Sequence, residues 1–167
     1  MPGALSWAQQ VQANYVILLP HLIIVATLVF VMLADLYLKQ KRLLVGVAVA
    51  GVVLAMVGVY YAANDSEIQA AISAGQPLEF WGKMIVADGF TLFMNLVILG
   101  IAALVLLLST DYVECFLRGA YLETFEVILA ATLGMMFMVS SRDLVTIYIG
   151  LELASISSYV LAGLLRK

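Results

Sequence analysis

The sequence predicts an all-α membrane protein, a bundle of five transmembrane helices. Apolar residues make up 65% of the chain and charged residues only 11%, and the mean hydropathy is +1.10. A soluble domain needs far more charge to cover its surface. The charges are also unevenly placed, because no ionisable Lys, Arg, Asp, Glu or His lies between Leu43 and Ala63. About 20 apolar residues in a helix cross a bilayer, so such stretches indicate membrane spans.

Five apolar segments have the length of a membrane span: Tyr15–Leu38, Leu43–Ala62, Gly89–Thr110, Tyr121–Ser140 and Leu144–Leu165. Every backbone amide must be paired in lipid, so a span is a helix or a strand of a closed barrel. Barrel strands are about half as long and alternate in polarity, which these segments do not. We therefore expect five helices in a single membrane domain, residues 1–167.

The one long connection, Ala63–Asp88, is expected to carry small elements of its own. Its polar first part favours a short helix around Glu67–Ala74. The stretch Leu78–Ala87 mixes aromatic and β-branched residues around a Gly-Lys pair, which favours a small β-hairpin. Asp88 stands where the N-cap of the following helix belongs.

The basic residues predict the orientation of the spans. With the N-terminus outside and the C-terminus cytoplasmic, the outer side receives only Lys83 and Arg142. The cytoplasmic side then receives Lys39, Lys41, Arg42, Arg118, Arg166 and Lys167. Six against two favours this topology under the positive-inside rule.

One carboxylate, Glu152, lies deep in the last span. It is the ninth of 22 residues there and the only charged one, so it lies close to the middle of the bilayer. A central acidic side chain costs roughly 2.5–3.5 kcal/mol on insertion scales, which makes it a candidate functional residue.

Helical spacing places other polar residues on the same face of the last span. Tyr148, Glu152, Ser155 and Tyr159 follow at intervals of three or four residues and form one polar stripe. A neighbouring stripe contains only small residues: Gly150, Ala154, Ser158 and Ala162. Small residues at every fourth position let helices approach closely in membranes. We therefore expect the last helix to be enclosed by others, with the polar stripe facing the protein interior.

Two interpretations of Glu152 remain open from the residues alone. It is either a group that binds and releases protons, or a neutral structural acid hydrogen-bonded to a neighbouring helix. Burial favours the neutral form of a carboxylic acid and a nearby cation favours the carboxylate, so such a site can be switched.

The other polar residues of the spans are interpreted as structural. His21, after a proline near the outer end of the first span, is expected to be a wet, interfacial histidine. Asp35 is expected to pair with Lys39 one turn later. Asn95 is expected to form an interhelical hydrogen bond.

Two further groups are also assigned structural roles. Glu123 and Glu126 lie in the first turns of their helix, where the helix dipole favours acids. The methionines nearby are expected to pack and not to bind a metal: Met135, Met136 and Met138.

Cofactor sites are not expected in this chain. It has one histidine and one cysteine, no Gly-rich phosphate loop and no Cys-x-x-Cys pair. These residues cannot build an ordinary haem, iron–sulfur or zinc site. No redox chemistry, metal or nucleic acid is therefore expected.

Two runs in the last two spans resemble a known family. The first, ATLGMMFMVSSRDL, covers Ala131–Leu144, and the second, YIGLELASISSYVLAG, covers Tyr148–Gly163. They resemble subunit N of the proton-pumping NADH:quinone oxidoreductase (respiratory complex I), an antiporter-like membrane subunit. The Asp-Gly-Phe run 88–90 and the Leu-Pro pair 19–20 are similar to this family as well. His21 departs from it, because relatives often have an acid there.

The resemblance implies a role in proton translocation coupled to quinone reduction elsewhere in the complex. It implies that Glu152 is the family's glutamate, which works with a lysine on a later helix. It also implies a bacterial inner membrane, other membrane subunits as partners, and quinone, flavin and iron–sulfur clusters on other subunits.

The second half of that proton-transfer pair is not found in the printed sequence. Family members are much longer, and no span here contains a lysine; the four lysines are Lys39, Lys41, Lys83 and Lys167. We therefore expect an N-terminal portion of such a subunit. The alternatives are a structural or assembly subunit, or a subunit of a related cation/proton antiporter or membrane-bound hydrogenase.

Overall fold

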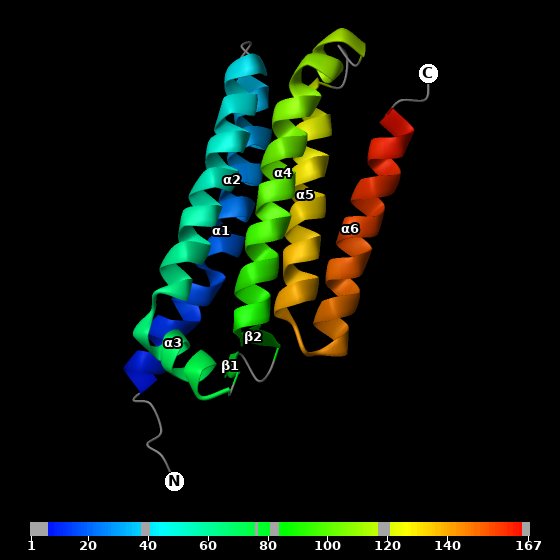
Figure 1. Ribbon diagram of the computed structural model, residues 1–167. Coiled ribbons are helices and arrows are strands. Elements are labelled where there is room, and N and C mark those ends of the chain that lie inside the picture. Colours follow the sequence, from blue (N-terminus) through cyan, green and yellow to red (C-terminus); the bar gives the residue numbers. More distant parts are fainter. Residues whose placement is uncertain (1–6, 38–40, 76, 81–83, 117–120, 165–167) are drawn as a thin grey trace.

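The computed structural model describes residues 7–37, 41–75, 77–80, 84–116 and 121–164. Five long helices run side by side (Figure 1). In chain order the elements are α1 (Trp7–Tyr37), α2 (Lys41–Ala63), α3 (Ser66–Ser73), β1 (Leu78–Phe80), β2 (Ile85–Ala87), α4 (Gly89–Phe116), α5 (Tyr121–Ser140) and α6 (Leu144–Leu164). The chain's two ends lie at opposite ends of the bundle, as an odd number of spans requires.

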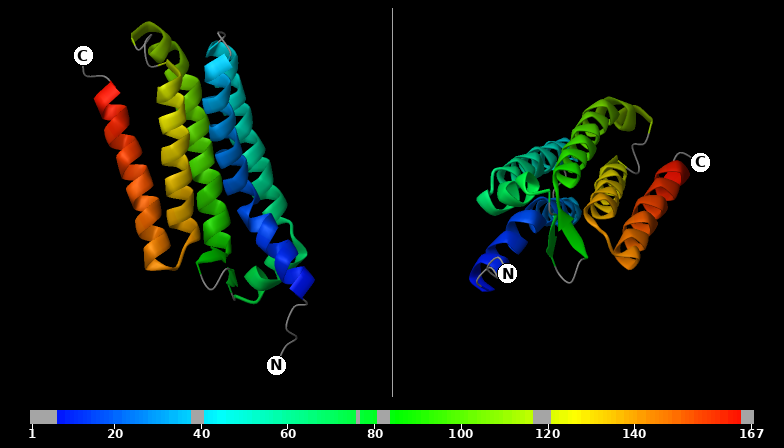
Figure 2. Two further views of the ribbon diagram at one scale, coloured as in Figure 1. Left: turned by 180° about the vertical axis from the view of Figure 1, so that it is seen from behind. Right: turned by 60° about the horizontal axis from the view of Figure 1, so that its bottom comes forward.

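Four of the long helices form a closed ring in which each packs against two neighbours. The ring runs α1–α2–α4–α5 and back to α1, whereas α6 packs almost entirely on α5, at one edge (Figure 2). The ring encloses the main apolar core, whose largest fully buried side chains include Ile24, Leu44, Leu99, Leu106, Phe125, Leu129 and Met136. Since lipid is as apolar as these side chains, close packing and hydrogen bonds hold such helices together.

The small elements lie together at one end of the bundle, which we call the hairpin end. The Asp65 side chain caps α3 by accepting from the backbone N–H of Glu67 at 3.0 Å. Strands β1 and β2 pair antiparallel, with Glu79 opposite Val86. A second apolar cluster packs them onto the helix ends, with Ile17, Ala62, Ile68, Phe80, Ile85 and Ala87 buried.

The start of α4 is fixed by Asp88, as the sequence predicts. Its carboxylate accepts the backbone N–H of Thr91 at 2.7 Å, and its carbonyl accepts that of Leu92 at 3.1 Å. Because the first N–H groups of a helix have no partner within the helix, this cap stabilises the start of the third span.

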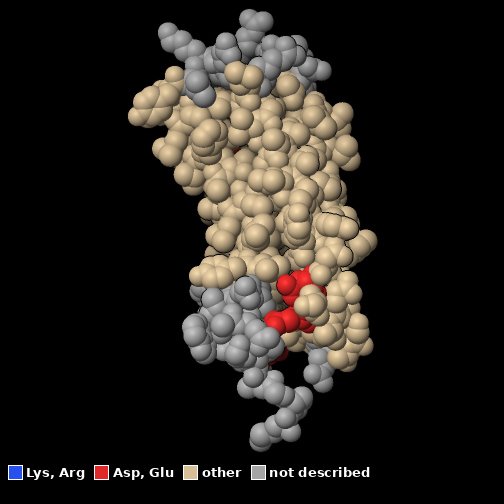
Figure 3. Space-filling model, turned by 90° about the vertical axis from the view of Figure 1, so that its left-hand side faces the viewer, with Lys and Arg blue, Asp and Glu red and all other residues tan. Residues whose placement is uncertain are grey.

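The outer surface of the bundle is apolar along its length. Large apolar side chains are strongly exposed on α1, α2, α4 and α6, among them Leu36 at 81% and Leu108 at 78%. Figure 3 shows one face, where the described charged side chains are acidic and gather near the hairpin end, below a broad uncharged belt. Soluble monomers rarely expose such surfaces. The five long helices each contain a stretch of 19 to 23 residues that could cross a membrane.

The predicted fold class, an all-α membrane protein with five spans, is confirmed. Two helices are longer than their apolar segments by six residues or more. α1 begins at Trp7 instead of Tyr15, and α4 continues to Phe116, beyond Thr110. Hydropathy marks only the part of a helix that lipid surrounds, whereas helical hydrogen bonding continues through polar residues outside it.

Candidate functional site

Glu152 lies on α6, which begins at a well-defined cap. The Asp143 carboxylate accepts the backbone N–H of Thr146 at 3.2 Å and its hydroxyl at 3.3 Å. Glu152 is the ninth of the 21 residues in α6, so it lies about 3 Å from the helix midpoint along the axis. Its side chain is exposed, and no described residue forms a hydrogen bond or ion pair with it.

The polar stripe of α6 is not enclosed by the helices of this chain, so the expectation of an interior face is wrong for the described bundle. Tyr148 is 62% exposed and Tyr159 is 75% exposed, Glu152 is exposed, and Ser155 is half-buried. The cause is that α6 packs on one side only, against α5.

That contact is made by small residues, as the neighbouring stripe predicts. A Cβ placed on Gly134 of α5 would lie 2.7 Å from the Gly150 carbonyl oxygen and 2.8 Å from the Ala154 nitrogen. Glu152 follows Gly150 by two residues, or about 200° around the helix. Close packing through Gly150 and Ala154 therefore turns the carboxylate away from α5. The sequence stripe missed Gly134, the glycine on the other side of the contact.

A second polar cluster lies inside the ring near the hairpin end. His21 of α1, Asn95 of α4 and Ser140 of α5 are 2%, 3% and 0% exposed. The Asn95 side-chain amide donates to Ser140 Oγ at 3.1 Å, and Ser140 Oγ lies 3.3 Å from His21 Nε2. The His21 ring also stacks at a tilt on Phe137, with ring centroids 4.9 Å apart.

This cluster corrects one prediction and confirms another. His21 is buried, so the expectation of a wet, interfacial histidine is wrong. Phe137 and Ser140 of α5 lie against the His21 ring, and the hairpin packs with Ile17 one turn earlier in α1. The pattern of a single helix cannot show that cover. Asn95 forms the expected interhelical hydrogen bond.

The end of α5 explains why polar side chains gather at this place. The last carbonyls of a helix lack partners within it, and lipid or a protein core supplies none. The Thr91 hydroxyl of α4 donates to the Val139 carbonyl at 3.4 Å, and Ser140 joins the cluster. Side chains from α1 and α4 thus surround the polar end of α5.

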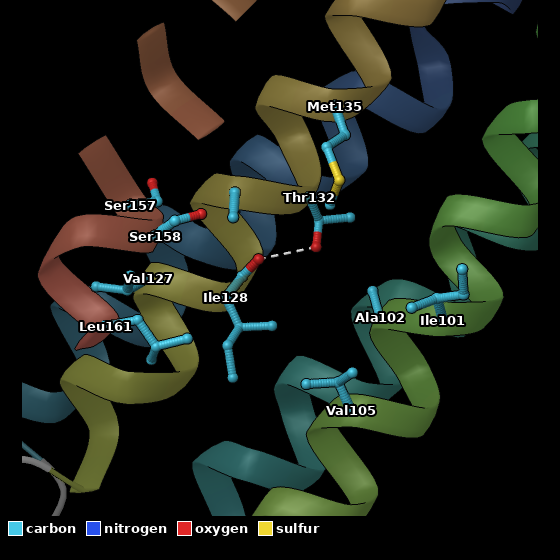
Figure 4. Close-up of a pocket in the computed structure, with 11 residues that line it drawn as sticks. Ile101, Ala102, Val105, Val127, Ile128, Thr132, Met135, Ser157, Ser158 and Leu161 are labelled. Atoms are coloured by element: carbon cyan, nitrogen blue, oxygen red, sulfur yellow. Dashed lines mark hydrogen bonds between the residues drawn. The ribbon is translucent and has the colours of Figure 1, made fainter. Parts of the chain in front are cut away.

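A shallow groove of about 160 Å³ runs along α5 between α4 and α6 (Figure 4). Its lining is apolar, from Ile101 on α4 to Leu161 on α6. Of its hydroxyls, that of Thr132 donates to the Ile128 carbonyl at 2.8 Å and that of Ser158 to the Ala154 carbonyl at 2.8 Å. Those hydroxyls are satisfied within their own helices, so the groove suits hydrocarbon better than a polar ligand.

The remaining predicted residues divide as follows. Glu123 lies in the first turn of α5 as expected, and Glu126 follows it three residues later in the same helix. The expected partner of Asp35, Lys39, lies outside the described residues. Met136 is fully buried, consistent with packing.

No group of three or more His, Cys, Asp or Glu side chains that could hold a metal occurs in the part of the chain that the structure describes.

Comparison with known proteins gives a consistent set of relatives. Over all 167 residues the chain is 68% identical to NADH-quinone oxidoreductase subunit N 2 of Symbiobacterium thermophilum, of which it covers 33%. It is 34% identical over 157 residues to the protein of the same name from Koribacter versatilis, covering 31% of it. It is 35% identical over 158 residues to NAD(P)H-quinone oxidoreductase subunit 2 of a Nostoc species, covering 28%.

The chain spans about a third of the length of these curated relatives. No protein-family model matches it. Together with the five apolar helices, the bacterial relatives identify a multi-pass protein of a bacterial inner membrane.

Proposed function

Because the chain belongs to the family of subunit N of NADH-quinone oxidoreductase, we propose that it takes part in moving protons across the membrane, coupled to quinone reduction in other subunits. The observation that carries the proposal is Glu152, a single carboxylate near the midpoint of a membrane-spanning helix. Intramembrane acids are retained at a cost and mark proton or ion pathways.

The geometry of α6 supports a proton-transferring role for Glu152 and a supporting role for its stripe. Tyr148, Ser155 and Tyr159 lie on the same face as the carboxylate and can hydrogen-bond to it or to water beside it. The contact through Gly150 and Ala154 holds this face away from α5. The carboxylate is therefore presented to whatever covers α6 on its free side.

We propose that other membrane subunits, or further helices of the same protein, cover that side. If the carboxylate faced lipid, its insertion into the membrane would cost roughly 2.5–3.5 kcal/mol of free energy. A cationic or hydrogen-bonding neighbour offsets this cost. Flavin, iron–sulfur clusters and quinone are assigned to other subunits. The basic residues support an arrangement with the hairpin end outside the cell.

The direct test is Glu152→Gln, made in the native gene and studied in native membranes. Gln keeps the size and hydrogen bonding of the side chain but cannot ionise. We expect NADH-driven proton pumping in inverted membrane vesicles to fall by about tenfold while the complex still assembles. Glu123→Gln is the matched control, because Glu123 is an exposed acid in the first turn of α5. We expect the complex with this variant to pump protons normally.

Unchanged pumping in Glu152→Gln would refute the proton-transfer role. The tight α5–α6 contact favours a second candidate function, that of an assembly subunit whose helices only pack. In that case Glu152→Gln is silent, and bulky substitutions at Gly150 or Ala154 abolish complex formation. Native gels of the solubilised complex distinguish the two functions.

A further inference from the structure

The buried cluster of His21, Asn95 and Ser140 is joined by two side-chain contacts. The Asn95 side chain donates through Nδ2, so Ser140 Oγ accepts there. The hydroxyl proton of Ser140 is then free to point at His21 Nε2, 3.3 Å away. When the hydroxyl donates to Nε2, that nitrogen carries no proton, and the proton of the neutral ring then lies on Nδ1.

Three buried polar atoms in and beside this cluster lack a protein partner. They are His21 Nδ1, Asn95 Oδ1 and Ser141 Oγ. The carbonyl groups of Ile17 and Met136 approach the His21 ring, but neither gives Nδ1 a hydrogen bond of good geometry. Buried donors and acceptors without partners are costly, and bound water is the usual remedy where several polar groups converge.

We propose that this cluster is a buried water-binding site. The water accepts a hydrogen bond from the Nδ1–H group of His21 and donates to the carbonyl groups that approach the ring, those of Ile17 and Met136. Such a water extends the hydrogen-bonded series that runs from Asn95 through Ser140 to His21. It makes the imidazole ring a group that can exchange protons within the membrane. α5 separates the site from the free face of α6 that carries Glu152 (Figure 2).

The inference does not depend on the role proposed for Glu152, since it rests on other helices and other atoms. His21 is the only histidine of the chain, so selective labelling reports this site alone. The experiment uses the full chain, prepared without a histidine tag, labelled with ¹⁵N and ¹³C histidine and reconstituted into phospholipid bilayers.

Solid-state NMR then measures the tautomer and the water contact separately. The ¹⁵N shifts should show the Nδ1–H tautomer, and magnetisation should pass from water protons to the ring. A Nδ1–H ring that receives no magnetisation from water would overturn the proposal, because Nδ1 would then be bonded directly to a carbonyl. A Nε2–H ring would overturn the hydrogen-bond direction on which it rests.

Variants test whether Ser140 sets the tautomer. Ser140→Ala removes the donor to Nε2, and the ratio of Nδ1–H to Nε2–H should fall by roughly tenfold. Ser157→Ala is the matched control, because the Ser157 hydroxyl is also buried but donates within its own helix, to the Leu153 carbonyl. If both variants give the parent spectrum, the assigned hydrogen-bond chain is wrong.

Discussion

The ring of α1, α2, α4 and α5 and the edge helix α6 are all apolar enough to cross a membrane but differ in how they are packed. In the membrane-spanning stretches of the ring helices 33–44% of the residues are buried, whereas in that of α6 only 11% are buried. In the ring, polar side chains meet each other, as Asn95 and Ser140 do. On α6 the polar stripe faces outward and Glu152 meets no described partner.

The difference shows that helices of the ring hydrogen-bond to one another through their side chains, whereas the polar stripe of α6 faces outward. α6 packs on α5 through glycine and alanine and carries a carboxylate on its other side. Among the described residues α5 is its main neighbour, and we infer that a second neighbour covers the side with the carboxylate. We therefore expect the ring to be the stable part of the chain, and α6 to depend on contacts beyond it.

The largest loss of stability is expected from Gly51→Leu, which disturbs the packing of the ring. A Cβ on Gly51 would overlap the Thr27 side chain of α1, whose hydroxyl already donates to the Ile23 carbonyl. Overpacking of this kind costs about 1–3 kcal/mol or more, and here it acts on the whole ring. SDS titration in mixed micelles, followed by tryptophan fluorescence, should show a much earlier midpoint. Gly46→Leu, with no atom near its Cβ, should leave the midpoint almost unchanged.

The next largest effect is expected from Gly134→Leu, which changes the position of the edge helix α6. The side chain would meet the backbone of Gly150 and Ala154, which cannot rotate away, so α6 must move off α5. Spin labels at the exposed positions Leu104 and Ile156 should then report a longer and broader distance between α4 and α6. The ring should keep its SDS midpoint. The control Gly100→Leu has open space at its Cβ and should leave the distance unchanged.

A smaller effect is expected from Asn95→Leu inside the ring. It removes the hydrogen bond to Ser140, and interhelical bonds of this kind in membranes average about 0.6 kcal/mol with a maximum near 1.7. The SDS midpoint should shift modestly and the α4–α6 distance should not change. A shift as large as that of Gly51→Leu would mean that the polar cluster, and not the packing, holds the ring.

The smallest effect is expected from Arg142→Gln in the α5–α6 turn. Arg142 lies 3.5 Å from the Glu79 carboxylate of the hairpin, and its side chain is half exposed. Surface ion pairs of this kind contribute about 0–1 kcal/mol. The SDS midpoint and the spin-label distance should both stay close to those of the parent chain. Detachment of α6 in this variant would show that the hairpin, and not Gly134, positions it.

Much of the architecture could be predicted from the sequence because the bilayer imposes simple rules. The length of an apolar run and the need to pair every backbone amide determine helices such as α2 and α4. Local side-chain chemistry determines the caps, as Asp88 shows at the start of α4. The small residues Gly150 and Ala154 indicated a close helix contact before its partner was known.

The burial of His21 and the exposure of Glu152 could not be predicted from the sequence, for a physical reason. Periodicity shows which residues share a face of a helix, but not what that face meets. His21 is expected to be interfacial from its own helix, and it is buried because Phe137 and Ser140 of α5 lie against its ring. Glu152 reads as interior and is exposed because Gly134 draws the opposite side of α6 onto α5.

The sequence by itself determined that five helices cross a membrane, which residue caps the start of α4, and that one helix carries a carboxylate at mid-depth. Those features depend on hydropathy, helix length and local capping, which act within one segment. Only the tertiary structure decided which helices close a ring, that α6 stays at its edge, and that His21, Asn95 and Ser140 meet. Those features depend on the rotation of each helix against its neighbours, which side-chain packing between distant segments sets.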